Sequence, residues 1–133
     1  MARDGTVWVG HPRGVSQMRG GVLSPVTSTS LFDDASTSQI LETRDGTIWF
    51  GTTESLVRRD PATGQFAKFS LPNATNSTVL SLYEDRRSRL WVSVQQRREL
   101  YCIQSNQVRV LKPELGHSAL DRHLGARDRK SVV

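Results

Sequence analysis

One short phrase, a tight turn followed by a strand-like run around a tryptophan, occurs three times in this chain. It reads DGTVWVG at residues 4–10, DGTIWFG at 45–51 and SRLWVSV at 88–94. The tryptophans are spaced 41 and then 42 residues apart, at Trp8, Trp49 and Trp91. A fixed period of this length indicates a repeat architecture, and the content of each repeat decides which kind. Because no unit places its apolar residues at helical spacing, the period predicts a repeat made of strands.

The best-preserved unit, residues 38–78, contains four short runs of strand-forming residues separated by turn signals. The runs cover residues 39–43, 47–52, 55–60 and 65–70. Asp45-Gly46 favours a hairpin between the first two runs, because glycine readily adopts positive φ. Pro61 and Gly64 mark a second reversal before the last run. Four short antiparallel strands in every repeat are typical of a propeller blade.

The third unit follows the same plan, with its runs at residues 78–85, 89–94, 99–103 and 107–112. The first unit lacks an opening strand, because Met1 falls where Glu42 stands in the second unit. We therefore predict an all-β fold, a partial β-propeller with about three blades of four-stranded antiparallel sheet in an open arc. The predicted boundaries place a blade without its first strand at 1–36, a complete blade at 37–78, a divergent third blade at 79–112 and an irregular tail at 113–133.

The strand around Trp49 shows why the phrase recurs. Side chains alternate along a strand, so Ile48 and Phe50 point to one face while Trp49 and Gly51 point to the other. Both faces are apolar or small, as expected if neighbouring sheets cover each side. The Asp-Gly turn fixes the register that places the tryptophan on the correct face. The phrase therefore predicts roles in packing and turn formation and no chemistry of its own.

With these runs and turns, residues 3–112 resemble three consecutive units of the two-component regulator propeller repeat. That repeat combines an acidic pair, Asp-Gly, a strand with tryptophan and Gly-Thr, then Gly-Leu, Arg-Tyr-Asp and Thr-Gly. The matching positions are Glu84-Asp85, Asp45-Gly46, Trp49, Gly51-Thr52, Leu56, Arg59-Asp60 and Thr63-Gly64. We assign to the structural repeat signature Asp4, Gly5, Trp8, Gly10, Asp45, Gly46, Trp49, Gly51, Asp60, Gly64, Asp85 and Trp91.

The third unit departs from the repeat at its hairpin. Arg87-Ser88 stands in place of Asp-Gly, and Ser93 stands in place of the glycine that follows the tryptophan. Because Asp-Gly readily supplies positive φ, we expect this hairpin to be looser, or of a different turn type, than the others.

The resemblance implies a ligand-sensing segment of an extracytoplasmic β-propeller sensor domain in a bacterial two-component signal-transduction protein. It implies a periplasmic or extracellular location within a membrane-anchored parent, whose histidine kinase domain lies outside this chain. The implied partners are an unknown small ligand, for which a glycan is one candidate, and the remaining blades of the parent propeller. Two alternatives stay open: a protein-interaction scaffold, and a propeller enzyme of the streptogramin-lyase type, which has a similar Trp-Gly phrase.

Charge and hydropathy argue against two classes of partner, nucleic acids and membranes. The formal net charge is +5, of which residues 122–133 carry +3. Since aromatic residues are not interleaved with the arginines, we predict no nucleic-acid binding. No apolar stretch approaches the roughly 20 residues needed to cross a bilayer, so we predict no membrane contact by this segment. The first ten residues contain no apolar h-region, which predicts no signal peptide on this chain.

Residues that could carry catalysis or bind metal are few. The histidines are His11, His117 and His123, and the last two are six residues apart rather than the four of a helical metal pair. Asp33-Asp34 lacks the glycine-containing ligand loop of a calcium site. Glu84-Asp85 and Asp45 recur between units, which favours turn capping over acid or base catalysis. We therefore predict no catalytic residue, no cofactor and no metal site, and hence a protein that is not an enzyme.

The last six residues, 128–133, read DRKSVV and resemble the translation of a common sequencing adapter. This resemblance predicts that they are not native to the protein. Together with a start partway through a unit, it predicts a gene fragment.

Overall fold

The computed structural model describes residues 1–33, 35–74, 77–95 and 98–112 of the chain. The predictions for the tail at 113–133, for His117 and His123, and for an adapter-derived segment at 128–133 lie outside the described residues.

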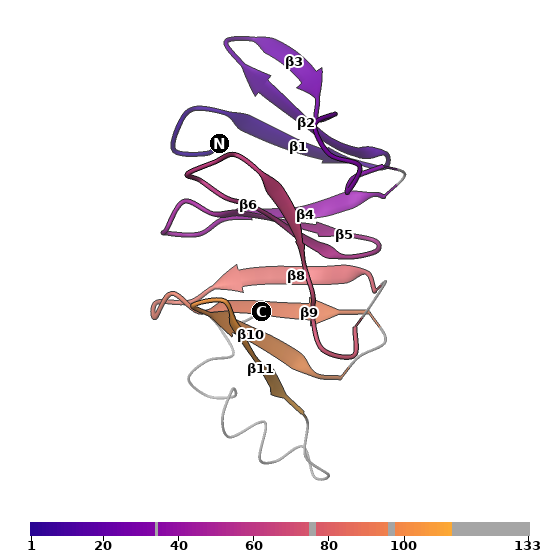
Figure 1. Cartoon of the computed structure of the whole chain (residues 1–133), viewed down its shortest axis with the longest axis vertical. Coiled ribbons are helices and arrows are strands. Elements are labelled where there is room, and N and C mark those ends of the chain that lie inside the picture. Colours follow the sequence, from indigo (N-terminus) through magenta and orange to yellow (C-terminus); the bar gives the residue numbers. More distant parts are fainter. Residues whose placement is uncertain (34, 75–76, 96–97, 113–133) are drawn as a thin grey trace.

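Across the described ranges, eleven strands form three antiparallel sheets, and no helix is present (Figure 1). Sheet 1 contains β1 (Val7–His11), β2 (Gly14–Arg19) and β3 (Val22–Pro25). Sheet 2 contains β4 (Thr37–Glu42), β5 (Ile48–Thr52), β6 (Leu56–Arg59) and β7 (Phe66–Phe69). Sheet 3 contains β8 (Val79–Glu84), β9 (Leu90–Val94), β10 (Leu100–Gln104) and β11 (Gln107–Leu111).

Each sheet is a meander, in which every strand pairs with the strand before and after it in the chain. The strand positions predicted for the second and third units are confirmed, because β4 to β11 each coincide with a predicted run. The register is regular except at one place in sheet 2 and one in sheet 3. The pairing shifts between Thr37 and Gln39 on β4 and between Val79 and Ser81 on β8, so the first strands of the two sheets share one irregularity.

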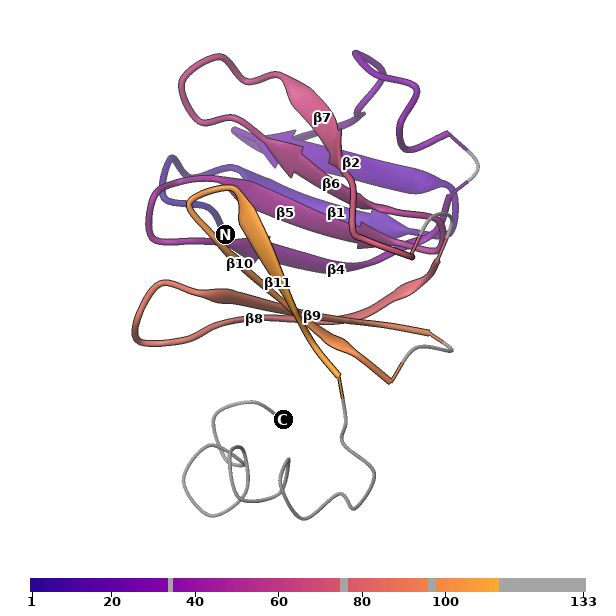
Figure 2. The same cartoon turned by 60° about the horizontal axis from the view of Figure 1, so that its bottom comes forward.

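Sheet 2 lies between sheets 1 and 3, and each sheet remains open (Figures 1 and 2). The first strands come together, since β4 contacts both β1 and β8, and β8 also contacts β5. The arrangement places one apolar core on each side of sheet 2.

The core between sheets 1 and 2 is rich in aromatic rings. Phe50 contacts Trp8, Phe32 and Phe66 with ring centroids 5.5, 5.1 and 5.8 Å apart. The contacts with Trp8 and Phe32 are edge-on, and aromatic pairs of that geometry contribute about 0.5–1.5 kcal/mol each beyond the burial of area. Ile48, on the same face of β5, belongs to the same core.

The core between sheets 2 and 3 is mainly aliphatic and contains the other face of β5. Trp49 packs there with Leu56 of sheet 2 and with Val79, Leu90 and Val92 of sheet 3. The predicted alternation along β5 is therefore confirmed, with one face buried against sheet 1 and the other against sheet 3.

Candidate functional site

Loops gather at two ends of the stacked sheets. The turn end contains the β4–β5 and β8–β9 hairpins, the segment before β1 and the β6–β7 turn. The two turns of sheet 2 are neighbours, because a Cβ built on Gly46 would lie 3.3 Å from the Cβ of Pro61. The connector end, at the other end of the strands, contains the remaining hairpin loops, such as the one between β5 and β6. It also contains the connectors from β3 to β4 and from β7 to β8.

The β4–β5 and β8–β9 turns have the same backbone conformation. The N–H of Gly46 donates to the carbonyl of Thr43 at 2.9 Å, and the N–H of Ser88 donates to the carbonyl of Asp85 at 3.1 Å. Gly46 has a φ of 90° and Ser88 a φ of 60°, so both residues adopt the left-handed region. The prediction of a looser or differently typed third hairpin is therefore wrong.

Aspartate side chains cap the turn before β1 and the β4–β5 turn. Oδ1 of Asp4 accepts a hydrogen bond from the N–H of Thr6 at 2.9 Å, and Oδ1 of Asp45 accepts one from the N–H of Thr47 at 3.0 Å. Each aspartate directly precedes a turn glycine, of which Gly5 has a φ of 89°. A short acceptor side chain thus satisfies a backbone donor that the turn would leave without a partner.

Sheet 3 obtains the same cap from a different residue. Arg87 occupies the position of the capping aspartate, and Asp85, two residues earlier, replaces it. Oδ1 of Asp85 accepts from the N–H groups of Arg87 and Arg89 at 2.9 and 3.0 Å. Its Oδ2 accepts from Nε of Arg89 at 2.7 Å and from the indole Nε1 of Trp91 at 2.9 Å. One carboxylate therefore preserves the turn and also anchors the tryptophan.

The pKa values of Asp45 and Asp85 lie below the ordinary value for aspartate. Burial raises each pKa, but hydrogen bonds outweigh it, from Trp91 and Arg89 at Asp85 and from Thr43 and the turn backbone at Asp45. Both carboxyls are ionised at neutral pH, which suits an acceptor that caps a turn and opposes a role as general acid.

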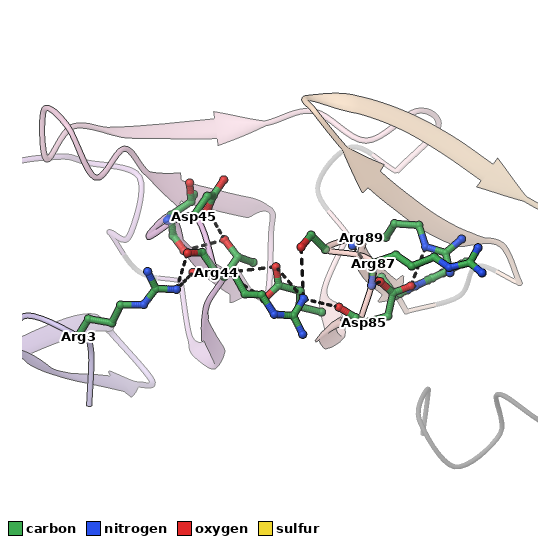
Figure 3. A network of polar contacts seen from close by, with 11 residues as sticks. Arg3, Arg44, Asp45, Asp85, Arg87 and Arg89 are labelled. Atoms are coloured by element: carbon green, nitrogen blue, oxygen red, sulfur yellow. Dashed lines mark hydrogen bonds and ion pairs between the residues drawn. The ribbon is translucent and has the colours of Figure 1, made fainter.

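The first interblade contact at the turn end joins Arg3 to sheet 2 (Figure 3). The backbone N–H of Arg3 donates to Oε1 of Glu42 at 3.0 Å. Its guanidinium donates to the carbonyl of Thr43 at 3.2 Å and lies 3.9 Å from the Glu42 carboxylate. These contacts tie the segment before β1 to the hairpin of the next sheet.

The second contact repeats the first between sheets 2 and 3. The backbone N–H of Arg44 donates to Oε1 of Glu84 at 3.0 Å, and its guanidinium donates to the carbonyl of Asp85 at 2.6 Å. Figure 3 shows Arg3 and Arg44 each reaching toward the next sheet. We call these two sets of contacts, made by Arg3 with Glu42 and Arg44 with Glu84, the arginine–glutamate ladder.

The ladder was missed by reasoning from the sequence, which interpreted Glu84 only as part of a capping pair. A positional signal was present. Arg3 and Arg44 each stand five residues before a tryptophan, and Glu42 and Glu84 each stand seven residues before one. A polar pair that recurs at fixed offsets in a repeat protein is a candidate contact between neighbouring repeats.

The glycine after each of the first two tryptophans lies where the next sheet approaches most closely. A Cβ on Gly10 would lie 2.3 Å from the carbonyl oxygen of Thr37, and a Cβ on Gly51 would lie 2.7 Å from Cγ1 of Val79. Both distances are too short for real atoms. The Trp-x-Gly phrase is therefore required because the first strand of the following sheet crosses this backbone.

Each tryptophan ring carries an arginine guanidinium over its face. The pairs are Arg59 on Trp8 at 5.5 Å, Arg58 on Trp49 at 6.0 Å and Arg89 on Trp91 at 5.3 Å. Such cation–π contacts contribute about 0.5–1 kcal/mol each at exposed sites.

The remaining signature residues shape the β6–β7 turn. The N–H of Gly64 donates to the carbonyl of Asp60 at 2.8 Å, and Oδ1 of Asp60 accepts from the N–H of Ala62 at 2.8 Å. Gly64 has a φ of 73°. The structure therefore places the signature residues in turns and at sheet contacts, and brings together Asp85 with Trp91.

Other candidate residues do not converge. Within the described ranges, no group of three or more His, Cys, Asp or Glu residues could hold a metal ion. The imidazole of His11 contacts Oγ of Ser16 at 3.2 Å. Cys102 is buried, and burial raises the pKa of its thiol. The same part of the chain has no helix long and apolar enough to span a membrane.

The connector end contains a small cavity of about 40 Å³ between sheets 2 and 3. Exposed Glu54 and Lys68 line it together with the serines Ser55, Ser70 and Ser77. Apolar side chains, including Leu71 of the β7–β8 connector, complete the wall. This end therefore combines long connectors with exposed charged groups.

Several solved structures share this arrangement of sheets. The extracellular domain of a B. thetaiotaomicron protein described as a one-component system has 24% sequence identity and a TM-score of 0.69, covering 81% of this chain and 16% of that one. Another structure of the extracellular domain of that same protein, there described as a hybrid two-component system, has 23% identity and a TM-score of 0.66, covering 83% of this chain and 16% of that one. Virginiamycin B lyase from Staphylococcus aureus has 20% identity and a TM-score of 0.68, covering 89% of this chain and 41% of that one.

These similarities define the fold as that of a β-propeller domain. The prediction of a partial, all-β propeller of three sheets in an open arc is confirmed. The chain spans less than half of the length of each of these structures.

Residues 30–54 match the family described as the two component regulator propeller. This segment contains β4, the Asp45 turn and β5. The resemblance to the two-component regulator propeller repeat is therefore confirmed for this segment. The comparison with curated proteins found no match.

Proposed function

We propose that this chain is a ligand-sensing segment of an extracytoplasmic propeller domain in a bacterial two-component signal-transduction protein. The supporting observation is the family match at residues 30–54, in a chain whose sheets are arranged as in extracellular domains of such systems. The proposal places the segment in the periplasm or outside the cell. It assigns binding rather than catalysis to this segment, and no cofactor.

The ligand contacts of the proposal lie at the connector end. At the turn end, aspartate caps and the arginine–glutamate ladder already use many of the polar groups of the hairpins. At the connector end, Glu54 and Lys68 are exposed beside the small cavity. Binding groups are disproportionately placed on loops that a rigid scaffold positions. A small polar ligand, with a glycan as the candidate, fits the hydroxyl and charged groups there.

The test is calorimetric titration of the chain with a panel of soluble neutral and acidic oligosaccharides. We expect saturable binding of one class, weakened at least fivefold by Lys68→Ala together with Glu54→Gln. Arg87→Ala, a change at the opposite end, is the control and should leave the affinity unchanged. No binding by any oligosaccharide, or equal effects at both ends, would contradict the proposal.

The fold similarity to virginiamycin B lyase keeps an enzymatic alternative open. One solved lyase structure contains quinupristin, which provides a probe. Consumption of quinupristin by the chain, followed by chromatography, would favour the lyase over the sensor. A scaffold without a small ligand would show neither activity nor oligosaccharide binding.

A further inference from the structure

A third arginine stands at the position that forms the arginine–glutamate ladder, and in the described residues it has no partner. Arg86 stands five residues before Trp91, as Arg3 and Arg44 stand before their tryptophans. Arg86 is exposed, and neither its backbone N–H nor its guanidinium has a hydrogen-bond or ion-pair partner in the described part of the chain. In both formed rungs, these same two groups bind the following sheet.

We propose that Arg86 is the docking point for a further propeller blade that carries a glutamate at the end of its first strand. The chemistry follows from the two formed rungs, where a carboxylate oxygen accepts the backbone N–H at 3.0 Å and a hairpin carbonyl accepts the guanidinium. A second copy of this chain does not fit, because Glu42 and Glu84 are both engaged in rungs of their own.

Ser93 adds a second requirement for that blade. It occupies the position of Gly10 and Gly51, where a Cβ would collide with the next first strand. Its hydroxyl lies 2.6 Å from that of Ser81 on β8. The incoming first strand must therefore stand farther from sheet 3 than β8 stands from sheet 2, while the rung at Arg86 holds its hairpin.

The test uses the full chain with residues 70–111 duplicated in tandem, so that the second copy follows Leu111 directly. This junction keeps the spacing, because β7 ends at Phe69 and β11 at Leu111, 42 residues apart as are Trp49 and Trp91. Ser93→Gly in the first copy allows the added first strand to approach as it does at Gly51. The added Glu84 then faces Arg86 of the first copy.

Amide hydrogen exchange of the added blade is the readout. We expect protection of its strands, and Arg86→Ala in the first copy should speed their exchange about fivefold, since a charge-assisted hydrogen bond is lost. The matched control Arg87→Ala removes a neighbouring charge and should change exchange less than twofold. In the unduplicated chain, Arg86→Ala should have no effect beyond twofold.

Glu84→Gln in the added copy provides the coupling test. It should also speed exchange, because it weakens the acceptor of the backbone N–H, and combined with Arg86→Ala it should cause less change than the sum of the two single effects, because the guanidinium and the carboxylate form an ion pair at 3.9 Å in both formed rungs. Equal effects of Arg86→Ala and Arg87→Ala, no effect of Glu84→Gln in the added copy, or an added blade without protection would each overturn the proposal.

Discussion

The β4–β5 and β8–β9 hairpins form the same turn from different residues. Sheet 2 uses Asp45 and Gly46, whereas sheet 3 uses Asp85 and Ser88. The capping carboxylate has moved two residues along the chain, and the turn hydrogen bond from the left-handed residue is retained. A hairpin in a repeat protein can therefore keep its geometry without its motif, provided that some acceptor reaches the same backbone donors.

The largest expected effect concerns the glycine position after the tryptophan, where the two sheets differ. Gly51→Ser, which installs the sheet 3 residue in sheet 2, should cost about 3 kcal/mol, because the new Cβ overlaps Val79. The reverse change, Ser93→Gly, should cost only about 0.5–1 kcal/mol, from added backbone freedom. Urea unfolding of both variants measures the difference, and similar losses would contradict the close approach at Gly51.

The next effect compares the two capping aspartates. Asp85→Ala should destabilise the chain by about 2 kcal/mol, because it removes the cap together with the bonds to Arg89 and Trp91. Asp45→Ala should cost about 1 kcal/mol, because it removes only the hydrogen bonds from the N–H of Thr47 and the hydroxyl of Thr43. Urea midpoints provide the measurement. A larger loss at Asp45 would show that the relocated carboxylate does not have the double role assigned to it.

The pH dependence sharpens the same comparison. The folded pKa of Asp85 is lowered, so its stabilisation is fully present above the unfolded pKa of about 3.9 and is lost as the pH falls through the folded value. Asp85→Asn should therefore be less stable than the original chain at pH 7, with the gap narrowing below about pH 4. A gap that stays constant down to pH 2 would argue against the ionised cap.

The smallest effect concerns the left-handed residue of each turn. Ser88→Gly should stabilise the chain by about 0.5–1 kcal/mol, because glycine adopts a φ of 60° without a Cβ clash. Gly46→Ser should destabilise it by a similar amount. Thermal unfolding of the two variants is the measurement, and a loss of stability in Ser88→Gly would mean that the hydrogen bond from Arg44 to the Ser88 hydroxyl, 3.3 Å long, outweighs the backbone strain.

The strands, and the face to which each side chain points, could be predicted from the sequence because the patterns that indicate them are local. Ile48, Trp49 and Phe50 alternate, and Asp45-Gly46 determines the register, so each residue informs on its neighbours. The turn of sheet 3 was mispredicted because Arg87 stands where the motif places its aspartate, whereas Asp85, two residues earlier, reaches the backbone donors of the turn. The backbone donors, rather than the motif position, determine which carboxylate serves.

The contacts between sheets could not be predicted as readily. Arg44 and Glu84 are 40 residues apart, and their meeting depends on how two sheets are offset, which no local pattern reports. The same holds for Gly51, whose need for a bare backbone arises from Val79 of the next sheet. Fixed offsets from the tryptophans would have indicated such pairs once the repeat was aligned.

The central claim is that the strands of Trp8 and Trp49 each pack against the sheet that follows them in the chain. The most direct measurement is a two-dimensional nuclear Overhauser spectrum of the chain, examined for cross-peaks between the indole protons of Trp8 and the ring protons of Phe50. The account predicts these cross-peaks, because the ring centroids are 5.5 Å apart across the interface of sheets 1 and 2. Indole cross-peaks confined to residues of sheet 1 would contradict it.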